Sequence, residues 1–334
     1  MTQATSIEWT DLSWNPVHGC SKVSPGCAHC YAETLSRQRG QTPKPWTPEN
    51  APENVILKPH KLREPLSKAK VWQGLGAAAA AAGKTEGKLV FVNSMSDLFH
   101  EDIPDEYIAQ VFGIMALAPQ HTFQILTKRP ERMRDLMIAW KDWRHGLHAE
   151  TSTMPLSNVW LGVSIENRRW TDRARLLQST PAAVRFVSAE PLLGPLICPR
   201  CKGQGSVPAW GGAPGMAACP EGCADNDSPY DRYWLEGIDW LIVGGESGSE
   251  HRPMQVEWVQ DLLEACVCVD CHGEGEREEG IGRDCFGNWD TRTVRCGTCR
   301  EGMTTAFFFK QDSGARPGQA GRFAEMSLPK EFPR

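Results

Sequence analysis

The sequence has 334 residues, enough for one large α/β domain or two smaller ones, and its 40% hydrophobic residues can fill a sizeable core. The formal net charge of −5 argues against non-specific coating of duplex nucleic acid, although it allows a local basic groove. No apolar run approaches the roughly 18 residues of a membrane-spanning helix, and the N-terminal MTQATSIEW lacks the basic start and apolar core of a secretory signal. We therefore expect a cytoplasmic protein without membrane contact.

The first distinctive stretch is NPVHGCSKVSPGCAHCYAET, residues 15–34. A weak strand near residues 12–17 is predicted before its cysteines, and a helix over residues 28–39 after them. Because cytoplasmic thiols stay reduced, we interpret the 13 cysteines of the chain as metal ligands before disulfides. The stretch supplies three of them in a C-x6-C-x2-C pattern, namely Cys20, Cys27 and Cys30.

Two kinds of metal centre fit three neighbouring thiolates. A zinc ion would need a fourth ligand, which His18 or His29 could supply. A 4Fe–4S cluster ligated through three of its irons would keep the fourth iron open for a small molecule.

An alanine run follows over residues 77–82, and we predict that it is a flexible surface insertion. The next residues, Gly83, Lys84 and Thr85, resemble the end of a phosphate-binding loop. The earlier glycine that such a loop requires is replaced by Ala78, so no nucleotide site is predicted there.

Six further apolar runs, rich in β-branched and aromatic residues, are predicted as strands buried on both faces. They cover residues 88–93, 122–126, 158–164, 184–189, 239–245 and 304–309. Helices are predicted between them over residues 104–118, 130–140, 166–179 and 253–265. Together with the first strand, these β–α alternations imply an α/β fold whose parallel sheet forms a complete or partial TIM-like barrel.

Charged and hydroxyl side chains follow these strands, where a barrel of this type carries its active site. The candidates are Asn93, Ser94, Asp97, Lys128, Ser164, Glu166, Glu190, Glu246 and Lys310. We expect convergence on one cavity for Asp97, Lys128, Ser164, Glu166, Glu190 and Glu246. The three-cysteine loop would lie on the same face of the barrel, which favours the cluster over a structural zinc ion.

Two glycine-rich, aliphatic-poor inserts interrupt this pattern. We predict a first barrel part over residues 1–194, an insert over 195–236, more barrel over 237–265, a second insert over 266–302, and a last strand and tail over 303–334. Each insert has two cysteine pairs, and two pairs complete a four-thiolate zinc site. The predicted ligands of two zinc ions are Cys198, Cys201, Cys219, Cys223, Cys268, Cys271, Cys296 and Cys299. Pairing within or between the inserts stays open, and Cys266 and Cys285 are interpreted as ordinary thiols.

Several motifs resemble known families. EWTDLSWNPVHGCSKVSPGCAHCYAE, FVNSMSDLFHEDIP, ILTKRPERM, LGVSIEN, EPLLGP, DWLIVGGESG and FFFKQ, taken together, resemble a phage-associated three-cysteine-motif family of unassigned function. That resemblance runs over residues 6–312, apart from the alanine run and the inserts. The cysteine loop ahead of a partial barrel also resembles the radical S-adenosylmethionine (SAM) superfamily. Within the inserts, CPRCKGQGS and CVDCHGEGE resemble the half-sites of the DnaJ-type zinc region.

The radical SAM resemblance implies an iron–sulfur enzyme that reductively cleaves SAM and starts radical chemistry on a substrate, with an electron donor such as flavodoxin or ferredoxin. Cys20, Cys27 and Cys30 would hold its 4Fe–4S cluster. Their x6 spacing departs from the usual C-x3-C-x2-C. A second departure is that Gly244-Gly245-Glu246 follows a late strand, whereas the superfamily has this motif after the second strand.

The same resemblance implies roles for single residues. His29 has the usually aromatic position near the adenine, and Lys128 would pair with the SAM carboxylate. The end of the second strand, where the superfamily meets the SAM amino group, carries Asn93, Ser94 and Asp97. The ribose hydroxyls would be held by Ser164 and Glu166. The catalytic candidates that face the substrate are Glu190, Glu246 and Lys310.

A competing function comes from basic segments that hold Arg129, Arg132, Arg134, Lys141, Arg144, Arg168, Arg169, Arg173 and Arg175. With the zinc inserts and nearby tryptophans these could form a nucleic-acid-binding surface, whereas their acidic neighbours favour ordinary solvated helix faces. A nucleotide or nucleic acid is therefore a candidate substrate for the enzyme. The alternative is a non-catalytic zinc-rich protein that binds nucleic acid or a protein partner, with a third zinc ion on the first three cysteines.

Overall fold

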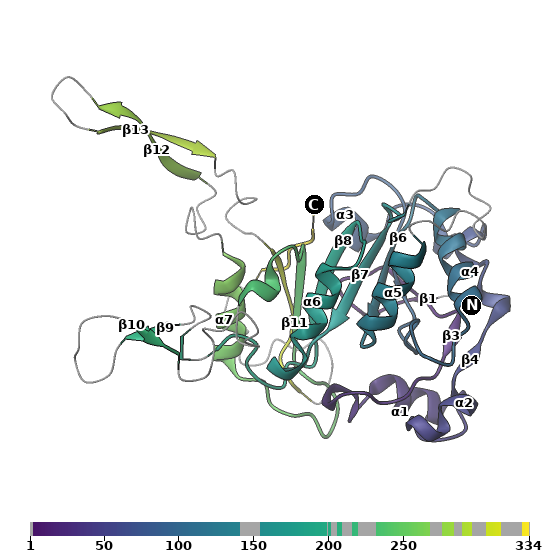
Figure 1. Ribbon diagram of the computed structural model, residues 1–334. Helices are drawn as coiled ribbons and strands as arrows, with labels where there is room; N and C mark the ends of the chain where they lie inside the picture. The colour runs from purple at the N-terminus through teal and green to yellow at the C-terminus, as the bar shows by residue number, and fades with distance from the viewer. Residues whose placement is uncertain are drawn as a thin grey trace.

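The computed structural model describes residues 3–140, 154–198, 200–201, 206–208, 216–219, 232–267, 276–283, 289–295, 305–314 and 329–333. Figure 1 shows a curved sheet with helices packed on one side of it, and hairpins that lie apart from the sheet. Within the described residues, no helix combines the length and apolarity needed to cross a bilayer.

The main sheet has seven parallel strands in the described part of the chain, and β1 (Gln3–Ala4) extends it as an antiparallel edge. In spatial order the parallel strands are β2 (Leu12–Trp14), β5 (Leu89–Val92), β6 (Thr122–Thr127), β7 (Val159–Ser164), β8 (Val184–Ala189), β11 (Trp240–Gly244) and β14 (Ala306–Gln311). This order equals their order in the chain, as in a half-barrel that winds in one direction. The predicted α/β fold with a large parallel sheet is confirmed.

Helices occupy the connections between the strands. The longer ones are α1 (Tyr31–Gln38), α4 (Asp105–Ala116), α5 (Pro130–Trp140), α6 (Asp172–Gln178) and α7 (Val256–Cys266). The short ones are α2 (Ala51–Asn54), α3 (Ala77–Ala81) and the 3-10 turns η1 (Pro25–Cys27), η2 (Pro48–Asn50), η3 (Pro59–Lys61), η4 (Glu64–Leu66), η5 (Lys70–Trp72), η6 (Arg168–Trp170) and η8 (Arg232–Leu235). Helix α5 begins at Pro130 as predicted, where the missing N–H of proline costs nothing.

Alternate residues along the strands face two different cores. The outer face packs against the helices through residues such as Val90, Ile125 and Val163. The inner face carries an aromatic floor, which we define as Trp9, Phe91, Trp160, Phe186, Trp240 and Phe308. Trp160 and Trp240 meet edge to face with their ring centroids 5.9 Å apart. The floor fills the lower part of the half-barrel and leaves the carboxyl ends of the strands for polar side chains.

The alanine run is not the flexible surface insertion that the sequence predicted. It forms α3, in which Ala78 and Ala79 are buried in the same cluster as Trp9. The Asp11 carboxylate accepts the backbone N–H groups of Ala78 and Ala79 at 2.8 and 3.2 Å, and so caps the helix. Because this cap comes from a residue far back in the chain, the local alanine pattern does not reveal it.

The predicted helix over residues 166–179 begins later than expected. The Asn167 side chain accepts the Arg169 N–H at 3.1 Å and caps the turn η6, so that α6 starts only at Asp172. Asparagine side chains compete in this way with helix propagation. Glu166 is therefore free of the helix and stays at the carboxyl end of β7.

Antiparallel strand pairs lie within both predicted inserts. The first pair is β9 (Ser206–Pro208) with β10 (Met216–Ala218), and the second is β12 (Glu276–Arg283) with β13 (Trp289–Arg295). Figure 1 shows both pairs away from the main sheet. Next to the cysteine loop, β3 (Val17–His18) pairs with β4 (Ile56–Leu57).

Candidate functional site

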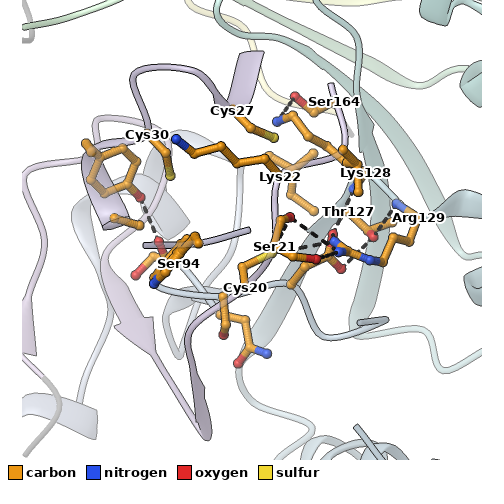
Figure 2. A pocket seen from close by; sticks show the side chains of 18 of the residues that line it. Cys20, Ser21, Lys22, Cys27, Cys30, Ser94, Thr127, Lys128, Arg129 and Ser164 are labelled. Carbon is orange, nitrogen blue, oxygen red and sulfur yellow. Dashed lines mark hydrogen bonds and ion pairs between the residues drawn. The ribbon is translucent and has the colours of Figure 1, made fainter. Parts of the chain in front are cut away.

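A cavity of about 130 Å³ lies at the carboxyl ends of β5, β6 and β7. Cys20, Cys27 and Cys30 all line it, and Figure 2 shows them together with side chains from the strand ends. A single water needs only about 10–15 Å³ of such volume. The cavity can therefore hold a group much larger than one ion.

Glycine and proline shape the loop that carries these cysteines. At Gly19 the backbone φ is +84°, and a Cβ there would lie 1.9 Å from the carbonyl oxygen of Asn54, so only glycine fits. Pro25 begins the 3-10 turn that ends at Cys27, and Cys30 is the N-cap residue of α1. These local structures hold the three cysteines in place around the cavity.

The three sulfurs of the loop are less closely grouped than those of a second cysteine group in the first insert. Thiolates bound tetrahedrally at about 2.3 Å from zinc lie roughly 3.8 Å from one another. Among the described residues, the group whose ligand atoms all lie within 4.8 Å of one another is Cys198, Cys201 and Cys219. The cysteines of the loop share one cavity without this close spacing.

The two histidines of the loop have different surroundings. His29 Nδ1 lies 3.2 Å from Glu246 Oε2. His18 is buried, and burial, helped by the charge of Lys61, lowers its pKa to about 4. A lowered pKa keeps the imidazole of His18 neutral, which is the form in which histidine binds a metal.

The strand ends form the polar wall of the cavity, which includes Asn93, Ser94, Asp97, Thr127, Lys128, Arg129 and Ser164. Lys128 Nζ donates to Ser164 Oγ at 2.8 Å and lies 3.8 Å from Glu166 Oε1. Ser164 Oγ in turn donates to the carbonyl oxygen of Glu190 at 3.1 Å. The ends of β6, β7 and β8 are thereby joined in one polar layer.

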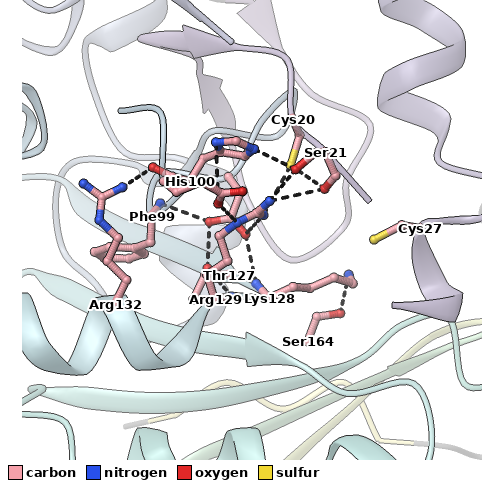
Figure 3. A network of polar contacts seen from close by, with 12 residues as sticks. Cys20, Ser21, Cys27, Phe99, His100, Thr127, Lys128, Arg129, Arg132 and Ser164 are labelled. Atoms are coloured by element: carbon pink, nitrogen blue, oxygen red, sulfur yellow. Dashed lines mark hydrogen bonds and ion pairs between the residues drawn. The ribbon is translucent and has the colours of Figure 1, made fainter. Parts of the chain in front are cut away.

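Arg129 connects this wall to the cysteine loop, as Figure 3 shows. Its Nη1 donates to Cys20 Sγ at 3.5 Å and to Asp97 Oδ2 at 3.3 Å. Its Nη2 donates to Ser21 Oγ at 2.9 Å, and its Nε donates to Glu101 Oε2 at 2.8 Å. The guanidinium therefore contacts a predicted metal ligand and two carboxylates at once.

Asp97 holds this arrangement together through both carboxylate oxygens. Oδ1 accepts the Phe99 N–H at 3.0 Å and the Thr127 hydroxyl at 2.7 Å, and Oδ2 accepts the Lys128 N–H at 3.0 Å besides Arg129. It was predicted to bind the cofactor. The structure places it in the cavity wall, with its oxygens engaged by the protein.

Asn93 differs from the rest of the wall. Its side chain is buried, and neither Nδ2 nor Oδ1 has a hydrogen-bond partner. The backbone φ is +63°, a left-handed conformation that asparagine tolerates better than most residues. Native proteins rarely leave a buried amide unpaired, so this side chain is a candidate contact for a ligand or an ordered water in the cavity.

A strap, which we define as residues 24–26 between the first two cysteines, crosses to the later strands. The Ser24 hydroxyl donates to Glu166 Oε1, at the end of β7. Arg252 Nη2 donates to the carbonyl oxygen of Pro25 at 3.0 Å, and Arg252 Nε donates to Glu246 Oε2 at 2.9 Å. Glu166 and Glu246 thus help to position the strap, beside the cavity rather than in its lining.

The remaining catalytic candidates pair with each other on the inner face of the sheet. Lys310 Nζ donates to Glu190 Oε1 at 2.7 Å, and Ser188 Oγ donates to Glu190 Oε2 at 3.0 Å. A Cβ at Gly244 would lie 2.7 Å from Glu190 Oε1, so the glycine makes room for this carboxylate. The pair is only partly buried, with side-chain exposures of 22% and 15% for Lys310 and Glu190.

The electrostatics of the cavity oppose free thiolates. Burial raises the pKa of the Cys20 thiol to about 12, and Asp97 adds to this rise while Arg129 opposes it. Burial also raises the pKa of Cys30. Burial acts against the charge of Arg129, but Asp97, Cys20 and Glu101 together raise its pKa above the usual value. A metal that binds these thiols must displace their protons.

Several arginines predicted for a nucleic-acid surface are paired within the chain, whereas Arg168 and Arg169 are exposed. Arg134 pairs with Asp135 at 2.7 Å, and Arg132 Nη2 donates to the carbonyl oxygen of Ile103 at 2.6 Å. Arg173 is buried and pairs with Glu166 at 3.2 Å. Lys141, Trp143 and Arg144 lie outside the described residues.

A second cysteine group lies in the first insert. Cys198, Cys201 and Cys219 are buried, and the Sγ atoms of Cys198 and Cys219 are 3.9 Å apart. This buried three-cysteine group could bind a metal or cluster. The other predicted zinc ligands lie outside the described residues, namely Cys223, Cys268, Cys271, Cys296 and Cys299.

A family model described as a protein of unknown function, DUF5131, matches residues 4–272. The chain belongs to the DUF5131 family. The match includes the cysteine loop and every strand from β2 to β11, and it ends before β12. No curated protein and no solved structure matches the chain. The chemistry of this DUF5131 protein has to be inferred from its cavity.

Sequence reasoning missed several contacts of the site. In this DUF5131 protein His100 is fully buried and its Nε2 lies 2.8 Å from Ser21 Oγ, which binds Arg129. Arg252 was not a candidate either, although it holds both the strap and Glu246. The strand-end candidates include Lys128 but not its neighbour Arg129, which was assigned to the basic surface. The strand-end pattern gives no signal for Ser21, His100 or Arg252, because these lie inside loops.

Proposed function

We propose that this protein is an iron–sulfur enzyme of the radical SAM type, with a 4Fe–4S cluster on Cys20, Cys27 and Cys30. The observation that carries the proposal is the common cavity of these three thiols at the carboxyl ends of the strands, which has room for a group much larger than one ion. The position at the carboxyl ends of a parallel half-barrel supports an active site. The resemblance of the loop to the radical SAM superfamily supports this choice of cluster chemistry.

A cluster with SAM at its open iron supplies a one-electron reduction and a carbon radical that takes hydrogen from a substrate. Several side chains of the polar wall suit particular parts of the SAM molecule. The Lys128 ammonium suits the SAM carboxylate, and the unpaired Asn93 amide suits the amino-acid part of SAM. Ser164 suits a ribose hydroxyl. Glu166 is occupied by Ser24 and Arg173, so we assign it to positioning of the strap.

The substrate would lie beyond Ser164, toward Glu190 and Lys310 on the inner face of the sheet. The proposed reaction also requires an electron donor of the flavodoxin or ferredoxin class. A nucleotide or nucleic acid remains the candidate substrate.

The test is anaerobic reconstitution of the purified protein with iron and sulfide. We expect absorbance near 400 nm and, after reduction, release of 5′-deoxyadenosine from SAM. Replacement of Cys20, Cys27 or Cys30 by Ala should abolish the cluster. The buried Cys266 in α7 is the matched control, and Cys266→Ala should retain the cluster. If a zinc ion stays bound to the three cysteines during reconstitution, the proposed enzyme function is wrong and a zinc-rich binding protein is favoured.

We further propose that each insert binds one zinc ion with its own cysteines. Strand β9 begins five residues after Cys201, and Cys219 follows β10 directly. The second insert repeats this register, because β12 begins five residues after Cys271 and Cys296 follows β13 directly. An antiparallel hairpin brings the chain on its two sides together at the open end, which favours pairing within one insert.

Zinc analysis of one variant distinguishes the two pairings. Replacement of Cys268, Cys271, Cys296 and Cys299 by Ser should leave one zinc ion per chain when each insert binds its own. If each zinc ion were instead shared between the inserts, no site with four thiolates would remain, and the variant would lose both ions.

A further inference from the structure

Arg129 is the cation that reaches a sulfur of the cysteine loop. Its Nη1 lies 3.5 Å from Cys20 Sγ, and its side chain is 10% exposed. Lys22 also lines the cavity, but it is 38% exposed and its Nζ pairs with Glu33 at 2.9 Å. Lys128 donates to Ser164. Among the described residues, a hydrogen bond from a charged side chain to a loop sulfur is found only for Arg129.

The carboxylates around Arg129 set the net charge near Cys20. Asp97 is buried, and its Oδ2 lies 3.3 Å from Arg129 Nη1. Glu101 contacts Nε at 2.8 Å, but its side chain is 61% exposed and its charge is screened by water. The charge balance beside Cys20 is therefore decided mainly by the buried pair of Arg129 and Asp97.

Reduction adds one negative charge to an iron–sulfur cluster. A hydrogen bond to a ligating sulfur and a nearby positive charge both stabilise the reduced form, and so they raise the reduction potential. A buried charge acts more strongly than an exposed one, because the surroundings have a lower dielectric constant. Arg129 satisfies both conditions at Cys20.

We infer that Arg129 is a positioning residue that raises the reduction potential of the cluster, and that Asp97 offsets part of this effect. The inference rests on the proposed function. Arg129 also holds Ser21 through Nη2, at 2.9 Å from the hydroxyl and 3.3 Å from the carbonyl oxygen, so the guanidinium stays in a fixed orientation beside Cys20. The electron comes from an external one-electron donor, and no proton transfer is part of this step.

The experiment is a redox titration of the anaerobically reconstituted full-length protein. Dithionite with mediators supplies one electron per cluster, and electron paramagnetic resonance measures the reduced fraction. For Arg129→Gln we expect the reduction equilibrium constant to fall at least tenfold, which is about 59 mV for a one-electron couple. For Asp97→Asn we expect a change of the opposite sign. Lys22→Gln is the matched control in the same cavity, and it should change the constant less than twofold.

Opposite signs for the two variants are the decisive result, because loss of structure alone does not raise the potential in one variant and lower it in the other. Iron content and circular dichroism establish that each variant is loaded and folded. Where Arg129→Gln fails to load, Arg129→Lys keeps the charge without the fork of donors and should show a smaller decrease. An unchanged potential in loaded Arg129 variants overturns the inference. Failure of the wild-type protein to take up a cluster rejects the proposed function instead.

Discussion

Asn93 leaves both atoms of its amide unpaired in the cavity wall, and its backbone has φ +63°. Glycine adopts this conformation without strain, so Asn93→Gly removes the amide and preserves the backbone. We expect the free energy of unfolding to change by less than about 1 kcal/mol. The affinity of the reconstituted protein for SAM should fall roughly tenfold, the value of one lost hydrogen bond. Calorimetric binding and urea unfolding measure both. Unchanged affinity would mean that the amide serves another ligand.

The buried His121 should make the free energy of unfolding depend on pH. It is buried, and burial, helped by the charge of Lys88, lowers its pKa to about 4. The unfolded chain, with a histidine pKa of about 6.5, takes up this proton first as the pH falls. The stabilisation is therefore complete above about pH 6.5 and is lost toward pH 4, with about 2 kcal/mol lost at pH 5.

The variant His121→Asn tests this expectation, since it keeps an acceptor for the Lys88 N–H and removes the titrating group. Urea unfolding at pH 7 and pH 5 should show a smaller loss of stability for the variant than for the wild type. The exposed His60 is the control, and His60→Asn should keep the wild-type difference. An equal difference in all three proteins would contradict the assignment.

At the scale of elements, the strap explains the long spacing of the first two cysteines. A Cβ at Gly26 would lie 2.5 Å from Glu166 Cγ and Oε1, so Gly26→Ala should displace the strap from β7. We expect iron per chain to fall at least twofold after reconstitution, with little loss of global stability because the loop is at the surface. Ala28→Ser, at an exposed position of the same loop, should load normally. Full loading of Gly26→Ala would show that the strap does not position the cysteines.

The elements themselves were largely predictable where they are buried on both faces. The predicted strand over residues 184–189 matches β8, and the one over 158–164 matches β7 within one residue, because continuous apolar runs have few other uses. The failures have non-local or side-chain causes. Asp11 converts the alanine run into a buried helix, and Asn167 delays α6. Neither effect is visible in hydrophobic periodicity.

The candidate site was predictable to a similar extent as the strands and helices. Strand ends meet at one side of a parallel sheet, so Asn93, Lys128 and Ser164 were found without a structure. Their partners were not, because contacts between Ser24 and Glu166, or between Arg129 and Cys20, join loops far apart in the chain. Because of its contact with Ser24, we assign Glu166 to the strap and not to the cofactor.

At the scale of the whole molecule, the half-barrel has two distinct parts. Its aromatic floor stabilises the fold, and the cavity wall is where we place the function. Trp240 lies in the aromatic floor, is fully buried, and packs against Trp160 and Phe186. Lys128 lies in the cavity wall above it. We expect Trp240→Ala to destabilise the protein by about 3–5 kcal/mol, because it removes a large buried side chain. Its affinity for SAM at low temperature should stay near that of the wild type.

Lys128→Gln should behave in the opposite way. Its side chain is partly exposed and donates to Ser164, so the loss of stability should be within about 1 kcal/mol. The affinity of the reconstituted protein for SAM should fall roughly 10- to 150-fold, as expected for a hydrogen bond to a charged group worth about 1.5–3 kcal/mol. Urea unfolding and SAM binding on the same preparations compare the two variants. If folded Trp240→Ala lost SAM while Lys128→Gln kept it, the cavity would not be the SAM site, and the ligand of the open iron would have to bind on the opposite side of the cysteine loop.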